Sequence, residues 1–281
     1  MTDMGCAVSR DLPEYRFSGR VIAIANQKGG VGKTTTAINL ATALAAIGRK
    51  VMIIDLDPQG NASTGFGIDR KARARTIYDV LTGNASLSEV SVDAGIPGLS
   101  VVPSSIDLSG AELELVSAER RSYRLREAIY GGAVQQAADA DYILIDCPPS
   151  LSLLTLNAMV AADSVLVPLQ CEFFALEGLS LLMKTIERVR AAFNPQLAIR
   201  GVVLTMFDKR NNLSQQVEAD VRGYLANKVY KTVIPRNVRV SEAPSYGKPA
   251  LLYDHKCVGS QAYIDLAKEV LRQERHSLKA A

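Results

Sequence analysis

Short runs of apolar residues alternate with helix-length segments over most of the chain. The run Val21–Ala25 is followed by a helix-length segment, Lys33–Ile47, and then by a second apolar run, Val51–Asp55. This order predicts β-α-β units, in which helices join parallel strands. Later runs predict five further strands: Leu99–Val102, Tyr142–Asp146, Ser164–Pro168, Gly201–Met206 and Val229–Ile234. We therefore expect an α/β protein, with a mostly parallel, twisted sheet and helices on both of its faces.

The two ends of the chain depart from this alternation. Residues 1–20 show no apolar periodicity and are expected to form a flexible tail. The segment Gln261–Gln273 predicts a helix that packs on the sheet through Tyr263, Leu266, Ala267 and Val270. No repeat or low-complexity linker is found between these ends. We expect one domain over residues 21–273, followed by a short C-terminal tail at 274–281.

The segment between the first strand and the first helix has the composition of a phosphate-binding loop. Residues 26–36 read Asn-Gln-Lys-Gly-Gly-Val-Gly-Lys-Thr-Thr-Thr. Glycines allow backbone N–H groups to turn toward a polyphosphate, and the helix N-terminus adds partial positive charge. Lys33 is expected to reach the β- and γ-phosphates, and the Thr34 hydroxyl to bind Mg²⁺. The predicted nucleotide contacts of the loop are Lys28, Gly29, Gly30, Val31, Gly32, Lys33, Thr34 and Thr35.

Two later strands end in acidic residues. Asp55 and Asp57 follow the second strand, and Asp146 ends the apolar run that begins at Tyr142. Ligands of open α/β sheets bind at the carboxyl ends of the strands. Asp146 has the pattern of a Walker B residue and is expected to hold Mg²⁺ through a water molecule. A carboxylate at this edge could orient a water for attack on the γ-phosphate, and Asp55 is expected to be structural.

The loop departs from the usual G-x-x-x-x-G-K-[ST] pattern, because Gln27 stands at its first glycine position and Lys28 follows. This form resembles the deviant loop of the ParA and MinD group of P-loop ATPases. Three further stretches, at residues 167–178, 204–208 and 233–244, make the chain resemble Soj-type ParA partition ATPases over essentially all of 21–270.

The resemblance implies a slow, Mg²⁺-dependent ATPase in which Lys28, Lys33 and Asp57 are catalytic. Lys28 would cross to the nucleotide of a second copy, so that ATP binding creates a sandwich homodimer. The adenine would lie near Pro235 and Asn237. The resemblance further implies non-specific binding to double-stranded DNA, hydrolysis stimulated by a ParB-type partner, and a cytoplasmic, nucleoid-associated protein that segregates chromosome or plasmid DNA.

The charge distribution agrees with a DNA partner. The net charge is only +3, but residues 200–256 hold ten Lys and Arg against five Asp and Glu, and the rest of the chain sums to −2. Contacts between Lys or Arg side chains and DNA phosphates release counterions, and they do not depend on the base sequence. Alignment with the family motifs indicates Arg210 and Arg239 as the best DNA contacts, with Lys209 and Arg236 in support. Each of these four could equally be a solvated charge or part of a local ion pair.

Three alternatives remain open. A membrane-bound positioning ATPase like MinD would end in an amphipathic helix, but the residues after Val270 are poor in apolar side chains, so stable membrane association is not expected. A reductase component like the nitrogenase iron protein would need two cluster cysteines, for which Cys147 and Cys171 are available. A partition ATPase could also carry a cargo other than DNA. The scattered cysteines and the polar first 20 residues favour a reduced, cytosolic protein.

Overall fold

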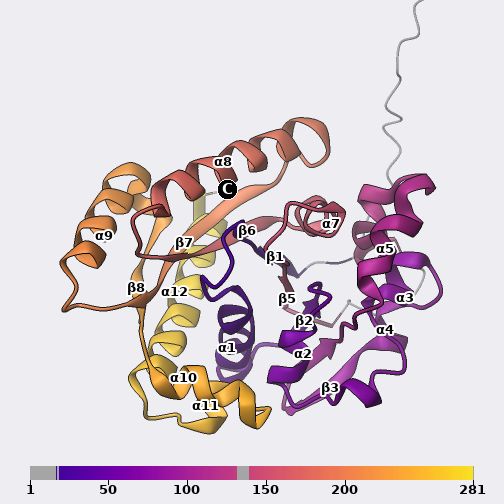
Figure 1. The fold of residues 1–281 in the computed structure, drawn as a ribbon, viewed down its shortest axis with the longest axis horizontal. Coiled ribbons are helices and arrows are strands. Elements are labelled where there is room, and N and C mark those ends of the chain that lie inside the picture. Colours follow the sequence, from indigo (N-terminus) through magenta and orange to yellow (C-terminus); the bar gives the residue numbers. More distant parts are fainter. Residues whose placement is uncertain (1–16, 18, 132–138, 281) are drawn as a thin grey trace, which may run out of the picture.

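One eight-stranded sheet organises the protein in a computed structural model, which describes residues 17, 19–131 and 139–280 (Figure 1). The strand order is β3-β4-β2-β5-β1-β6-β7-β8, and every neighbouring pair except β3 and β4 is parallel. The strands are β1 (Arg20–Ile24), β2 (Val51–Asp55), β3 (Val92–Ile96), β4 (Leu99–Val102), β5 (Tyr142–Asp146), β6 (Ser164–Gln170), β7 (Ala198–Phe207) and β8 (Val229–Pro235).

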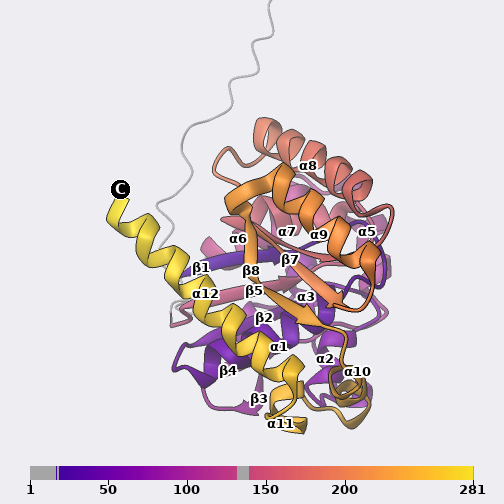
Figure 2. The ribbon, with the colours of Figure 1, turned by 90° about the vertical axis from the view of Figure 1, so that its left-hand side faces the viewer.

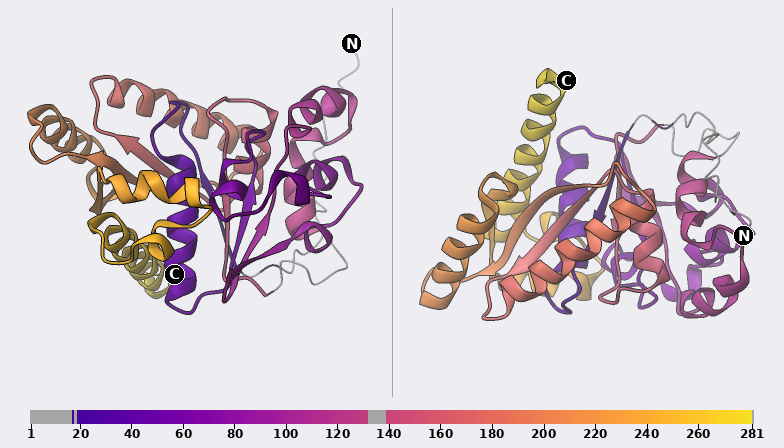
Figure 3. Two further views of the ribbon diagram at one scale, coloured as in Figure 1. Left: turned by 60° about the horizontal axis from the view of Figure 1, so that its bottom comes forward. Right: turned by 90° about the horizontal axis from the view of Figure 1, so that it is seen from above.

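Helices cover both faces of this sheet (Figure 3). Apolar residues of α3 (Ile77–Thr82), α4 (Leu87–Val90), α5 (Leu108–Glu114), α6 (Arg124–Tyr130), α7 (Leu153–Ala161), α8 (Ala175–Ala192) and α9 (Asn212–Leu225) share one core cluster. A second core cluster contains apolar residues of five other helices: α1 (Lys33–Ala46), α2 (Asn61–Gly65), α10 (Val238–Glu242), α11 (Ala250–Tyr253) and α12 (Val258–Ala280). Alternate strand residues enter the two clusters, as Ile22 and Ala23 do.

The predicted α/β class is confirmed: the sheet is mostly parallel and has helices on both faces. The seven predicted strands and the predicted helix after the first strand are all present, with bounds that differ by a few residues. The antiparallel edge strand β3 was not predicted, because its apolar and polar residues alternate weakly and three of its five residues are exposed. Most of the expected N-terminal tail, residues 1–16 and 18, lies outside the described residues.

The last helix is longer than predicted (Figure 2). Helix α12 begins at Val258 and runs through Ala280, past the expected end at Gln273. Tyr263, Leu266, Ala267 and Val270 are buried on the sheet, as expected. Glu274 still belongs to the packed domain, because its carboxylate accepts a hydrogen bond of 2.6 Å from Arg200 and a further one from Tyr142. The helix therefore continues past residue 273, and Glu274 is anchored by one ion pair and one hydrogen bond.

Candidate functional site

The strand order brings the predicted phosphate loop and the acidic residues to one edge of the sheet. β5 lies between β1 and β2, and its last residue, Asp146, pairs in register with Ile24 on one side and Asp55 on the other. The loop from Asn26 to Gly32 leaves β1 at this same edge and leads directly into α1. The loop, Asp55, Asp57 and Asp146 therefore converge although more than 100 residues separate them in sequence.

The backbone of the loop is shaped to receive an anion. Gly30 and Gly32 have φ values of +73° and +86°, in the left-handed region that glycine adopts without strain. No side chain caps the N-terminus of α1, so its first N–H groups are available to a ligand. The space around Gly29 and Gly30 is open. Thr205 holds the loop from behind, because its hydroxyl donates a hydrogen bond of 2.8 Å to the carbonyl oxygen of Val31.

Lys33 is buried at the start of α1 and points along the loop. Its side chain is 7% exposed, and Nζ donates to the carbonyl oxygen of Lys28 at 3.0 Å. Burial lowers the pKa of this ammonium, and the negative charges of Asp146 and Asp57 act against that decrease. A desolvated cation that donates only to one backbone carbonyl can exchange this bond for a phosphate oxygen. Thr34 and Thr35 follow it in the first turn and are partly exposed.

Asp146 is a fully buried carboxylate at the end of β5. Both of its oxygens lack a partner of normal geometry among the described residues. Burial raises its pKa well above the usual value, the charges of Asp55 and Asp57 raise it further, and the nearby Thr34 and Lys33 side chains offset part of the rise. Buried carboxylates without partners are rare and call for an explanation. A divalent cation between Thr34 and Asp146 would provide the missing charge, so the residues present fit Mg²⁺.

Asp55 and Asp57 have different surroundings. Asp55 is fully buried, and its Oδ2 accepts hydrogen bonds from the Ser63 N–H at 2.8 Å and the Ser63 hydroxyl at 2.6 Å. Burial raises its pKa, and these bonds lower it in part. Asp57 is half-buried at the start of the following turn, where Oδ1 accepts from the Gln59 N–H at 2.9 Å. Asp55 is thus occupied in anchoring α2, whereas the second oxygen of Asp57 accepts no hydrogen bond from the described residues.

Lys28 is held within its own chain. Its Nζ donates to Oε2 of Glu172, and the two side chains are 39% and 43% exposed. Glu172 lies in the segment between β6 and α8, next to an edge-to-face pair of exposed aromatic rings, Phe173 and Phe174. This ion pair could not be found from the sequence, since 144 residues separate the partners.

The predicted adenine segment lies at the end of β8. Pro235 is the last residue of the strand, and the Asn237 side chain caps α10 by accepting from the Val240 N–H at 3.3 Å. The Asn237 amide is thus already bonded to the protein, and no described contact joins it to the phosphate loop.

Three of the four predicted DNA contacts line one cavity. Lys209, Arg210 and Arg236 surround a hollow of about 800 Å³ beyond the ends of β7 and β8, and Lys256 adds a fourth cation. Arg210 is tied to Asp208, with Nε and Nη2 at 3.0 and 2.9 Å from the two carboxylate oxygens.

Arg239 lies apart from this cavity, on α10. Its Nη1 is 3.1 Å from the Glu242 carboxylate and its Nε is 3.8 Å from Asp254. The two residues that ranked first as DNA contacts, Arg210 and Arg239, are therefore engaged in local ion pairs. The two supporting residues, Lys209 and Arg236, are exposed and have no ion pair among the described residues.

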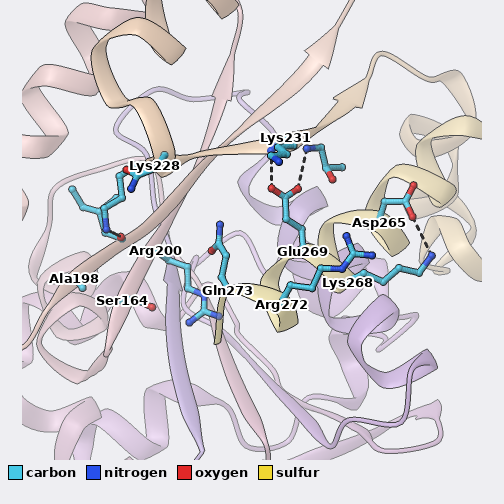
Figure 4. A pocket seen from close by; sticks show the side chains of 13 residues that line it. Ser164, Ala198, Arg200, Lys228, Lys231, Asp265, Lys268, Glu269, Arg272 and Gln273 are labelled. Atoms are coloured by element: carbon cyan, nitrogen blue, oxygen red, sulfur yellow. Dashed lines mark hydrogen bonds and ion pairs between the residues drawn. The ribbon is translucent and has the colours of Figure 1, made fainter. Parts of the chain in front are cut away.

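A second basic cleft, of about 700 Å³, lies between β8 and α12 at the opposite ends of the strands (Figure 4). Glu269 in this cleft accepts the N–H groups of Lys231 and Thr232 at 2.7 and 2.9 Å, and Lys268 pairs with Asp265. The cleft is lined by five cations and two carboxylates: Arg200, Lys228, Lys231, Lys268, Arg272, Asp265 and Glu269. Arg200, Lys228 and Lys231 belong to the basic segment 200–256, whereas the other four positions lie beyond it.

The structure bears on the iron–sulfur alternative. Cys147 and Cys171 are free thiols, 1% and 5% exposed within the core, and burial raises the pKa of both. Neither is placed to share an iron–sulfur cluster with a second subunit. In the described part of the chain, no helix is long and apolar enough to cross a bilayer, and no cluster of three or more His, Cys, Asp or Glu side chains could hold a metal by itself.

Comparison with known proteins places this site in a family. A family model described as AAA domain matches residues 19–199. The chromosome partitioning protein ParA of Caulobacter vibrioides is 64% identical over 256 residues, which cover 91% of this chain and 95% of that protein. The sporulation initiation inhibitor protein Soj of Bacillus subtilis is 53% identical, over 90% of this chain and 98% of that protein.

Solved structures share this architecture, and one of them holds an ATP analog and magnesium. Cobyrinic acid a,c-diamide synthase from Mycobacterium smegmatis, with bound ATP analog and magnesium, has a TM-score of 0.78 and 37% identity over 92% of this chain and 96% of that chain. The cell division ATPase MinD of Pyrococcus furiosus has a TM-score of 0.74 and 29% identity, covering 91% and 99%. The P-loop fold predicted from the sequence is confirmed by these relatives.

Proposed function

The chain belongs to the ParA family of partition ATPases, and from this premise we propose that it hydrolyses ATP with Mg²⁺ to control a DNA-binding dimer. The observation that carries the proposal is the buried, unpartnered carboxylate of Asp146 beside Lys33 and Thr34 at the mouth of the phosphate loop. A Mg²⁺ ion bound by Thr34 and, through water, by Asp146 would neutralise charge on the β- and γ-phosphates.

The residues of the chain supply the remaining steps. Lys33 moves its Nζ from the Lys28 carbonyl to the phosphates, and the N–H groups of Gly29 to Thr35 surround them. Asp57 orients the attacking water, since its free carboxylate oxygen lies near Lys33 and the loop. Pro235 and Asn237 are proposed to border the adenine.

Dimerisation requires Lys28 to leave Glu172. We propose that each Lys28 then contacts the nucleotide of the other subunit, so that the site is complete only in the dimer. Because the ion pair in the single chain is partly exposed, breaking it costs little, and ATP bound at two sites can supply that energy.

The dimer would bind duplex DNA through phosphate contacts. Lys209, Arg210, Arg236 and Arg239 are the proposed contacts. Two weak basic surfaces become one bivalent surface on dimerisation, so nucleotide state controls DNA affinity through avidity. A ParB-type protein would stimulate hydrolysis and release the dimer, and the protein would be cytoplasmic and associated with the nucleoid. The proposed role is the segregation of chromosomal or plasmid DNA.

The proposal is tested by the substitution Asp57→Ala. This variant should bind ATP as the wild type does, hydrolyse it at least about 100-fold more slowly, and remain as a DNA-bound dimer. DNA retention is measured with ATP, ADP and no nucleotide at two salt concentrations. Retention that requires ATP and decreases steeply with salt supports the proposal. Equal retention in all three nucleotide states, or normal turnover by Asp57→Ala, contradicts it.

A further inference from the structure

Arg73 lies directly behind the segment that carries Asp57. Its guanidinium makes three hydrogen bonds: Nη1 donates to the Ser104 carbonyl oxygen at 2.8 Å, and Nη2 donates to the Thr64 hydroxyl at 2.9 Å and the Ile68 carbonyl oxygen at 2.8 Å. One side chain thus connects α2, the turn after it and the segment after β4. Arg73 follows the 3₁₀ turn Arg70–Ala72 and is only partly exposed.

The bonds of Arg73 lead back to Asp57 through two residues. The Thr64 hydroxyl that accepts from Arg73 donates to the Gly60 carbonyl oxygen at 2.9 Å, and the Thr64 N–H donates to the same oxygen at 3.0 Å. The Gly60 N–H in turn donates to the Asp57 carbonyl oxygen at 2.9 Å. A continuous chain of hydrogen bonds therefore runs from the guanidinium to the backbone of Asp57.

The guanidinium also fills the space behind Gly60. Gly60 has a φ of +63°, and a Cβ placed there would lie 2.3 Å from Nη1 of Arg73 and 3.0 Å from the Ser104 carbonyl oxygen. The turn between Asp57 and α2 is thus packed against a rigid, planar, charged group. Without Arg73 this turn would lose both its support and its link to the Ser104 segment, while Asp55 would still hold Ser63.

We propose that Arg73 is a positioning residue for ATP hydrolysis: through Thr64 and Gly60 it fixes the turn that carries Asp57, without contacting the nucleotide. This inference rests on the proposed function, in which Asp57 orients the attacking water. A planar guanidinium bonded to three acceptors sets an orientation that a single ammonium cannot reproduce. A displacement of about 1 Å in a catalytic group can reduce a rate about 100-fold.

The test separates hydrolysis from nucleotide binding. Arg73→Gln and Arg73→Lys are compared with wild type and with Arg75→Gln, a matched control two residues away whose guanidinium forms only an exposed ion pair with Glu89. We expect both Arg73 variants to lower the rate of single-turnover hydrolysis by about 10- to 100-fold. The affinity for a fluorescent ATP analogue and the ATP-dependent dimer should stay within about twofold of wild type. In Arg73→Ala, millimolar guanidinium should restore part of the rate.

The outcomes are distinct. Hydrolysis at the wild-type rate by folded Arg73→Lys overturns the inference, because one ammonium nitrogen cannot reproduce bonds that two nitrogens of a planar guanidinium make. An equal loss of rate and nucleotide affinity, or no response to guanidinium, also overturns it and indicates a general structural role. If wild type and Arg75→Gln themselves do not hydrolyse ATP, the proposed function fails instead.

Discussion

Replacing Glu172 by Gln tests whether Lys28 is restrained in the single chain. The ion pair between them joins side chains that are 39% and 43% exposed, and pairs of this kind contribute about 0.2–1 kcal/mol. A dimer frees two copies of Lys28, so removing the restraint should stabilise the dimer by about 0.4–2 kcal/mol. The dissociation constant of the ATP-bound dimer should therefore decrease by about 2- to 30-fold.

The measurement is analytical ultracentrifugation with Mg-ATP, in an Asp57→Ala background that prevents loss of nucleotide. Glu177→Gln is the matched control, because Glu177 is an exposed residue on the neighbouring α8 and makes no ion pair among the described residues. The difference between the two variants should decrease as salt is raised. If Glu172→Gln weakens the dimer, Glu172 acts across the interface and not as a restraint, and the reasoning is refuted.

Two further predictions concern the metal and the DNA. Because the folded state raises the pKa of Asp146, the nucleotide-free protein should lose stability as the pH rises from the ordinary value of 3.8 through the folded pKa. Asp146→Asn should remove the share of this loss that Asp146 contributes, while Asp55, whose pKa burial raises to about 6, keeps its own share. The substitution should raise the unfolding free energy at pH 8 by at least about 1 kcal/mol and abolish stabilisation by Mg-ATP; denaturant melts at pH 5 and pH 8 decide this. The logarithm of the affinity for DNA decreases linearly with the logarithm of the salt concentration. Replacing Lys209 and Arg236 by Gln should make this dependence less steep, by about 1.8 per subunit. The same charge removed from the second cleft, at Lys231 and Lys268, should change the slope less if the cavity at the ends of β7 and β8 is the DNA surface.

Most of the fold followed from local sequence. Buried parallel strands are uninterrupted apolar runs, and β2 and β5 are recognisable because every residue in them is buried. Strand β3 and the end of α12 were missed for a common reason. Both depend on contacts outside the segment itself: β3 pairs with the adjacent strand β4, and α12 is held by the distant partners of Glu274, Arg200 and Tyr142. Their own residues carry little periodic signal.

The approach of the phosphate loop to Asp55, Asp57 and Asp146 was predictable because these segments are sequence motifs attached to strand ends. Convergence at one sheet edge then follows from the strand order. The supporting contacts were not predictable. Arg73 meets Gly60, and Lys28 meets Glu172, only through tertiary structure. Nothing in the local sequence distinguishes Arg73, Lys28 or Glu172 from other surface charges.

The DNA surface shows where counting charges fails. Ten cations in residues 200–256 predict a positive field, but the field near a duplex depends on which cations lack a carboxylate partner. Arg210 is neutralised locally by Asp208, and Arg239 by Glu242. An exposed pair of this kind is weak, so phosphate can replace the carboxylate, but part of the binding energy is then spent on the exchange. Lys209 and Arg236 carry no such cost, so their removal should weaken DNA binding at least as much as removal of the two residues favoured by the sequence motifs.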